Sequence, residues 1–250
     1  MGYDLLREEE VDGARLRSML EDSPGKAAQA ILAAAGQGVV QAQLLLGQIL
    51  LDGRGIERDL VLARQWFAIA AKGDSAMAHN MLGRCLEHGW GGEQDLGQAA
   101  IHYRCAAEAG LDWGLYNYAN MLSTGRGVAK DQAAAYAAYR RAAEGGHAKS
   151  MNLVGRYLEL GIACEASFTR ARRWYRRSAE AGDFRGQFSH AAVLADQGDV
   201  AEALGWLRRA LDLGNANFLR TSIPSLEQAR DARIRALAPL YRERLLQLQG

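Results

Sequence analysis

Residues 150–182 read SMNLVGRYLELGIACEASFTRARRWYRRSAEAG, and this stretch decides the fold. Its first half carries Val154, Tyr157 and Leu158 at helical spacing, which predicts a short amphipathic helix. Its second half has apolar residues at the same spacing and ends at Gly182, which predicts a second helix. The stretch therefore predicts two short helices joined by a loop that contains glycine.

The same pattern recurs when the chain is shifted by 36 residues. Glycine occupies the loop at Gly53, Gly89, Gly125 and Gly161, and aspartate opens the second helix at Asp59, Asp95 and Asp131. A fixed period of this length is typical of a solenoid, in which short helix pairs stack and share a continuous core. The sequence therefore predicts an all-α protein of stacked antiparallel helix pairs.

The limits of the repeat divide the chain into three predicted regions. Residues 1–22 are expected to form an N-terminal helix with an apolar stripe of leucines and one valine. Residues 23–215 are expected to form the solenoid, as a half repeat followed by five units, the last with a loop shortened at 197–199. Residues 216–250 are expected to form a terminal cap with a polar outer face.

The terminal cap is predicted to contain one long helix. The sequence Ser225-Leu226-Glu227-Gln228 is typical of a capping box, which marks a helix start. We expect this helix to run to about Leu248 and to bend at Pro239.

The composition indicates no strong charge bias. The chain has 250 residues and a net charge of +1, so no overall field would draw it to nucleic acid or to a membrane surface. Its first residues lack the apolar segment of a secretory signal, and no apolar run approaches the ~20 residues of a membrane span. The three cysteines are irregularly spaced, which is typical of reduced thiols. We therefore expect a cytoplasmic protein without membrane insertion.

A glycine recurs in the middle of the first helix, at Gly47, Gly83 and Gly155, and Ala119 fills the same position in the remaining full unit of this length. Glycine inside a helix costs roughly 1 kcal/mol relative to alanine, so its recurrence needs a structural reason. We expect the partner helix of each pair to approach closely at these positions.

Several linked positions resemble the Sel1-like repeat family, a relative of the tetratricopeptide repeat. The resemblance covers residues 24–215 and is clearest at Leu46-Gly47, Gly53-Arg54-Gly55-Ile56, Asp59, Ala63, Trp66-Phe67 and Ala70-Ala71. It implies a right-handed, curved α-solenoid that binds or scaffolds other proteins, often in bacterial signalling, secretion or envelope-related pathways. The sequence departs from the family pattern in its fourth loop, where Cys164 and Ser167 replace the usual valine and aspartate.

Cys85, His88, His102 and Cys105 have side chains that commonly bind zinc. In an antiparallel helix pair, His88 and Cys105 would lie on the order of 15 Å apart. Zinc requires all its ligands at about 2.0–2.3 Å from the metal, so this set does not predict a zinc site. The glycines around Arg126 match the repeat loop and not a phosphate-binding loop. No catalytic arrangement is recognisable either, and we expect neither an enzyme nor a cofactor.

The second helices carry many arginines, and we expect these helices to form the outer face. The basic residues are Arg140, Arg141, Arg170, Arg172, Arg173, Arg176, Arg177, Arg208 and Arg209. The simpler interpretation is a solvated surface. The alternative is a surface that binds nucleic acid or an acidic partner.

The first helices vary between repeats on the face opposite their core positions, and we predict that this concave face binds the partner. The predicted residues are Asn80, Arg84, Trp113, Tyr116, Asn120, Asn152, Arg156 and Phe188. Arginine can pair with a carboxylate, asparagine can bond a peptide backbone, and aromatic side chains supply contact area. This mixture resembles the clamp by which tetratricopeptide domains hold extended peptides, so we predict a protein or an extended peptide as the partner. The alternative is that these are ordinary exposed residues.

Overall fold

The computed structural model describes residues 23–249, which divide into two compact units. The first unit contains residues 23–114 and the loop 125–129, and the second contains residues 115–124 and 130–249. All regular secondary structure in these described residues is helical, as predicted. The helix predicted within residues 1–22 lies outside the described residues.

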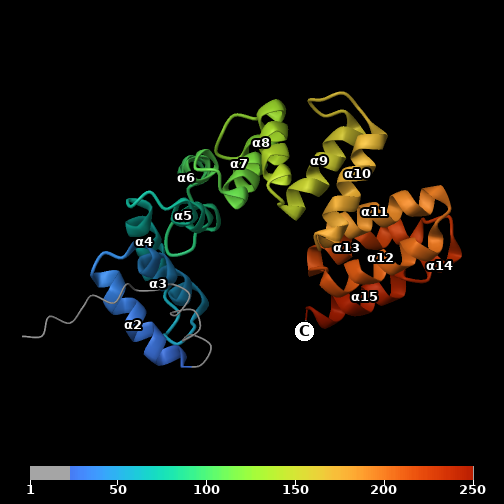
Figure 1. Cartoon of the computed structure of the whole chain (residues 1–250). Helices are drawn as coiled ribbons and strands as arrows, with labels where there is room; N and C mark the ends of the chain where they lie inside the picture. Colours follow the sequence, from blue (N-terminus) through green and yellow to red (C-terminus); the bar gives the residue numbers. More distant parts are fainter. Residues whose placement is uncertain (1–22, 250) are drawn as a thin grey trace, which may run out of the picture. The chain divides into compact units, whose positions relative to one another are not determined.

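The first unit is a stack of short helices joined by tight loops (Figure 1). It contains α2 (Pro24–Gly36), α3 (Val40–Asp52), α4 (Leu60–Ala71), α5 (Ala76–His88) and α6 (Leu96–Glu108). Each of these helices packs against the next one in the chain. The pairs α3–α4 and α5–α6 are the first two predicted full repeats, and α2 is the second helix of the incomplete leading repeat.

The second unit repeats this arrangement and adds the C-terminal helices (Figure 1). The division between the units falls within α7 (Asp112–Thr124). The helices that follow are α8 (Gln132–Glu144), α9 (Ala148–Leu160), α10 (Phe168–Glu180), α11 (Phe184–Gln197), α12 (Val200–Leu213), α13 (Ala216–Glu227), α14 (Ala232–Arg235) and α15 (Ala238–Gln247). Within residues 23–249, no helix has both the length and the apolar character needed to cross a membrane.

The predicted helix caps are confirmed. The side chains of Asp59, Asp95 and Asp131 each accept a hydrogen bond, 2.9 Å long, from the backbone N–H three residues later. These bonds satisfy amides that the first turn of a helix leaves without partners. Ser167 takes the same role at the start of α10, where its hydroxyl accepts from the Arg170 amide at 3.4 Å. The fourth loop therefore still provides a helix cap, although serine replaces the usual aspartate there.

The recurring glycines admit an aromatic ring from the second helix of each pair. A Cβ atom placed on Gly47, Gly83 or Gly155 would lie 2.6, 2.8 or 2.6 Å from the nearest ring atom of Phe67, Tyr103 or Tyr175, respectively. Such distances are well below ordinary carbon–carbon contact. The predicted close approach is confirmed, and it is an aromatic side chain that makes the contact.

The C-terminal region differs from the single helix predicted from Ser225. Helix α13 begins much earlier, after Asn215, whose side-chain oxygen accepts from the Phe218 amide at 2.9 Å. Ser225 lies close to the end of this helix, and two further helices follow it. The prediction was wrong because the buried stripe that includes Phe218 and Ile223 already forms a helical face before the capping-box sequence.

Candidate functional site

Buried tyrosines of the second helices hydrogen-bond to polar residues of the first helices. Tyr103 donates to a Glu87 carboxylate oxygen at 2.7 Å, Tyr175 to Glu159 at 2.5 Å, and Tyr139 to the side-chain oxygen of Asn120 at 2.6 Å. Burial, together with the adjacent Glu87 carboxylate, raises the pKa of the Tyr103 hydroxyl far above its ordinary value. These tyrosines therefore remain hydrogen-bond donors, and their partners on the first helices hold each pair together.

In the first unit, two of the three predicted residues remain accessible. Asn80 is buried, with 4% of its surface exposed, because α5 packs against both α4 and α6. Its expected position on the surface is therefore wrong. Arg84 is half-buried, and its guanidinium lies 5.2 Å from the ring centroid of Trp90, at cation–π distance. Trp113 is 40% exposed.

In the second unit, Tyr116 and Asn120 lie on α7. The Tyr116 ring is half-buried, and its centroid lies 4.9 Å from the ring of His147. Asn120 is also half-buried, and its side-chain oxygen is already used by Tyr139. The sequence did not predict this bond, because the repeat pattern does not specify whether a tyrosine donates to an asparagine or to a glutamate.

Asn152 and Arg156 are one turn apart on α9 and differ in exposure. Asn152 is 9% exposed, so the expectation that it lies on the surface is also wrong. Helix α9 contacts α8, α10 and α11, which leaves only a narrow arc of it in solvent. Arg156 lies in that arc, and it makes no hydrogen bond or ion pair with any residue of the described range. Arg156 is thus the predicted residue best placed for an acidic partner.

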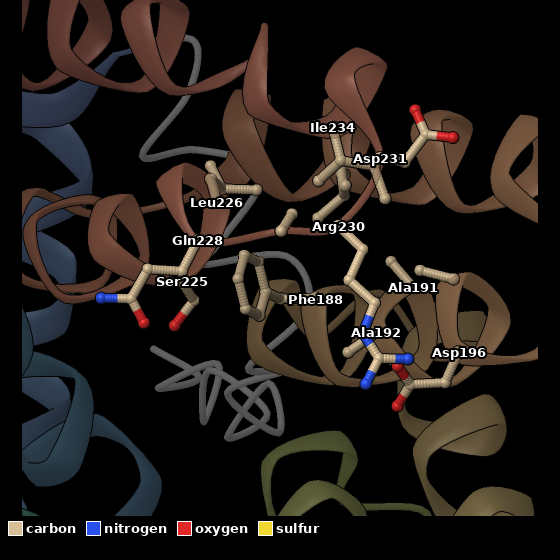
Figure 2. Close-up of a pocket in the computed structure, with 13 residues that line it drawn as sticks. Phe188, Ala191, Ala192, Asp196, Ser225, Leu226, Gln228, Arg230, Asp231 and Ile234 are labelled. Atoms are coloured by element: carbon tan, nitrogen blue, oxygen red, sulfur yellow. The ribbon is translucent and has the colours of Figure 1, made fainter.

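Phe188 lines a pocket of about 330 Å³ in the second unit. Figure 2 shows its ring pointing from α11 toward the segment that follows α13. The apolar part of the lining is completed by alanines of α11 and by Leu207, Leu226, Ala229 and Ile234. The Phe188 ring also packs edge-on against Phe218, at a centroid distance of 5.7 Å. One side of Phe188 therefore supports the core, and the other is part of the pocket wall.

Polar side chains also line this pocket. Asp196, Gln228, Arg230 and Asp231 contribute to its lining. Figure 2 shows the Arg230 guanidinium and the Asp196 carboxylate pointing toward one another. Asp231 is bound to Arg233 through two side-chain hydrogen bonds. No sequence signal predicted the residues after α13, because they lie beyond the repeat.

The residues weighed as zinc ligands have other neighbours. Burial raises the pKa of the Cys85 thiol to about 11, which disfavours the thiolate that binds metal. His102 lies beside His79, with 2.9 Å between their Nδ1 atoms, and the His88 ring packs on Trp90. Within the range 23–249, no three histidine, cysteine, aspartate or glutamate side chains come together as a possible metal site.

The profile of the Sel1 repeat matches this chain at residues 40–75, 76–111, 114–147, 148–183 and 195–215. These matches together cover more than half of the chain. The first four follow successive helix pairs, and the last contains α12 and only the end of α11. A comparison with curated protein sequences found no match.

Solved structures with the same repeat are also similar. A Sel1 repeat protein from Oxalobacter formigenes aligns with a TM-score of 0.80 and 25% identity, over 93% of this chain and 96% of that one. The c5321 protein, a protective antigen of uropathogenic Escherichia coli with an SLR fold, aligns with a TM-score of 0.72 and 26% identity; the match covers 94% of this chain and 53% of that one. The immunity protein Pa5087 from Pseudomonas aeruginosa, at 14% identity and a TM-score of 0.55 over 84% of this chain and 81% of that one, shares the fold alone.

Proposed function

Because the chain belongs to the Sel1 repeat family, whose members are generally protein–protein interaction modules, we propose that it binds another protein through its first helices and catalyses no reaction. The partner contributes an extended segment with at least one large apolar side chain. The family also supports a role in a bacterial signalling, secretion or envelope-related pathway. The three cysteines are unpaired, which supports a reducing compartment such as the cytoplasm.

The pocket beside Phe188 is the observation that carries this proposal. Binding pockets are typically concave and mainly apolar, with a few polar groups that orient the ligand. A volume of about 330 Å³ is at the small end of the range for such sites, and it suits one or two large side chains of a peptide. The polar side chains of the lining can bond the backbone on either side of the anchored residue.

Exposed residues of the first helices supply the remaining contacts in the proposal. In the second unit, which contains the pocket, these are Arg156 and the accessible part of Tyr116. Asn80 and Asn152 are too buried to take part. Asn120 is committed to Tyr139 and contributes little.

The test blocks the pocket without disturbing the core. Ala192 is exposed and lines the pocket, so Ala192→Arg should fill the entrance with a long charged side chain. A partner would first be captured with the wild-type protein and identified, and its binding segment would then be titrated by calorimetry. We expect Ala192→Arg to weaken binding about 10-fold or more, as loss of a buried anchor does.

Ala137→Arg is the matched control, because Ala137 is equally exposed but lies on second helix α8. It adds the same charge and should leave the affinity unchanged. Arg156→Ala should weaken binding by about 1–3 kcal/mol, the scale of a charge-assisted hydrogen bond. Equal binding by wild type and Ala192→Arg, with a loss in Ala137→Arg, would contradict the proposal.

A further inference from the structure

The basic residues of α10 line a second pocket within the second unit. It has a volume of about 480 Å³ and lies between α10, α11 and the start of α12. Its lining consists of Thr169, Arg172, Arg173, Arg176, His190, Val193, Leu194, Gln197 and Glu202. None of these residues lines the pocket beside Phe188, so the two sites are separate.

Positive charge is in excess in this pocket. Three guanidinium groups line it against the single carboxylate of Glu202. Arg172 and Arg173 are exposed and form no ion pair with another residue of the range 23–249. Arg176 pairs with Glu180 at 2.8 Å, but both side chains are more than half exposed. Exposed pairs one turn apart on a helix contribute little energy, so Arg176 can exchange this partner for a ligand.

The Glu202 carboxylate is partly engaged elsewhere. One of its oxygens accepts a hydrogen bond from the indole N–H of Trp206 at 3.3 Å. This contact holds the carboxylate at the α12 side of the pocket, whereas all three arginines come from α10. A negatively charged group can therefore contact the arginines on one side of the pocket.

His190 places a buried, unpartnered polar group in the same pocket. Only 8% of its surface is exposed, and its Nδ1 atom has no hydrogen-bond partner among the described residues. The equivalent positions of the other units hold Leu46, Leu82, Tyr118 and Val154. His190 packs edge-on against the Trp206 ring, with 5.5 Å between the ring centroids. This contact leaves Nδ1 without a hydrogen bond, which is costly for a buried polar atom.

We propose that this pocket binds a phosphate-bearing group. The planar guanidinium offers paired N–H donors that match phosphate oxygens, and clustered arginines are typical of phosphate recognition. The His190 imidazole also lines the pocket and can contribute one hydrogen bond to the bound group. This site goes beyond the proposed partner binding by the first helices and does not depend on it.

The other basic pairs fit an extended polyanion less well. Arg209 lies over the ring of Trp206 at 4.6 Å, and Arg140 is paired with Glu144 in the same way as Arg176 is with Glu180. Arg172 and Arg173 have no such partner, and they line one pocket together with the buried His190. This arrangement favours one compact anionic group over a nucleic acid strand lying along the second helices.

The test measures binding of pyrophosphate to the full chain by calorimetry at low salt. Arg172→Ala/Arg173→Ala should raise the dissociation constant about 10-fold or more, because two charge-assisted contacts are lost. Arg140→Ala/Arg141→Ala is the matched control, since it removes the same charge from α8, and it should bind as wild type does. Pyrophosphate should also shift the nuclear magnetic resonance signals of the His190 ring, which a His190→Gln variant would assign.

A parallel titration uses a phosphoserine peptide and its unphosphorylated form. Tighter binding of pyrophosphate would identify a free phosphate compound as the ligand, and tighter binding of the phosphopeptide would identify a phosphorylated protein; either result supports the site. Three results would overturn it. They are the absence of saturable pyrophosphate binding at millimolar concentration, an equal loss in both double variants, and binding of a single-stranded oligonucleotide alone with steep salt dependence.

Discussion

Gly83 shows how a single hydrogen atom sets the spacing of a helix pair. A Cβ on this residue would lie 2.8 Å from two ring atoms of Tyr103, and the hydroxyl of that ring is held by Glu87 at 2.7 Å. The ring therefore has little freedom to move aside. Gly83→Leu should destabilise the protein by about 1–3 kcal/mol or more through overpacking.

Gly83→Ala separates ring displacement from helix propensity. The sequence suggested a mild effect, because Ala119 occupies the equivalent position. The structure predicts a loss of roughly 1 kcal/mol, since the methyl group still displaces the ring and offsets the usual gain of alanine in a helix. Urea unfolding of both variants beside wild type would measure these losses. A leucine variant as stable as wild type would contradict the close contact.

Asp183 leads to a prediction about pH. It caps α11 by accepting from the Gly186 amide at 2.8 Å, and it is only 5% exposed. Burial raises the pKa of its carboxyl above the ordinary value, despite the opposing effect of that hydrogen bond. A raised pKa means that the folded state favours the protonated acid. The Asp183 carboxyl therefore contributes to the free energy of unfolding at low pH. This contribution is lost as the pH rises through the pKa that the carboxyl has in the folded state.

Asp183→Asn keeps the cap and removes the titration. We therefore expect wild type to lose stability relative to Asp183→Asn as the pH rises from about 4 to neutrality. Urea unfolding midpoints of both proteins across this range would measure the difference. Asp183→Ala is the control, because it should be less stable than Asp183→Asn at every pH through loss of the cap. A difference between wild type and Asp183→Asn that stays constant with pH would refute the assignment.

For single residues, the sequence predicted helix caps and close contacts better than it predicted the solvent exposure of side chains. Asp59 and Gly47 could be interpreted because each type of residue has a local cause that recurs with the period. The burial of Asn80 and Asn152 could not, because it depends on how many neighbouring helices surround α5 and α9. The pocket beside Phe188 was missed for a similar reason, since part of its wall comes from residues outside the repeat.

Among the loops of full length, the one after α9 departs from its counterparts in lacking a second glycine. Gly55, Gly91 and Gly127 have φ values of 76°, 73° and 68°, and Ala163 takes the equivalent position with a φ of 53°. This left-handed conformation costs an alanine roughly 1–2 kcal/mol through its Cβ. The fourth loop therefore has the same left-handed conformation as the other three loops, although alanine replaces glycine there.

Ala163→Gly should stabilise the protein. The relief of the left-handed strain exceeds the extra entropy of glycine in the unfolded chain, so we expect a gain of roughly 0.5–1 kcal/mol. Thermal unfolding would show it as a higher melting temperature. The reverse change, Gly127→Ala, should destabilise, because its Cβ would also lie 2.0 Å from the Leu96 carbonyl oxygen. A lower melting temperature for Ala163→Gly would show that the loop is not strained.

The C-terminal helices show where element prediction failed. A capping-box sequence predicts a helix start only when no earlier helix already includes it. Here the Asn215 cap and the apolar stripe of α13 place Ser225 inside a helix, even though Pro224 precedes it. The final helix is instead fixed by packing: the Tyr241 hydroxyl donates to the Leu207 carbonyl of α12 at 2.7 Å. These two residues are far apart in the sequence, so no local sequence pattern predicts their contact.

For the whole molecule, the period predicted the architecture because one unit cannot bury its apolar face alone. The division into two units was not predictable, since the pattern runs through Gly114 and Leu115 without interruption.

Far-ultraviolet circular dichroism of the full chain should show a spectrum dominated by helix. A substantial strand contribution would contradict the fold.

The contacts between loop glycines and neighbouring backbone also affect where the chain can accept insertions and deletions. Cβ atoms on Gly91 and Gly127 would lie 2.1 and 2.0 Å from the carbonyl oxygens of Leu60 and Leu96, so each loop rests on the second helix of the repeat before it. Around Gly198, by contrast, no heavy atom lies within 4 Å of such a position. Insertions and deletions should therefore accumulate at 197–199, where four residues are already missing from the period, while the other two loops hold a constant length.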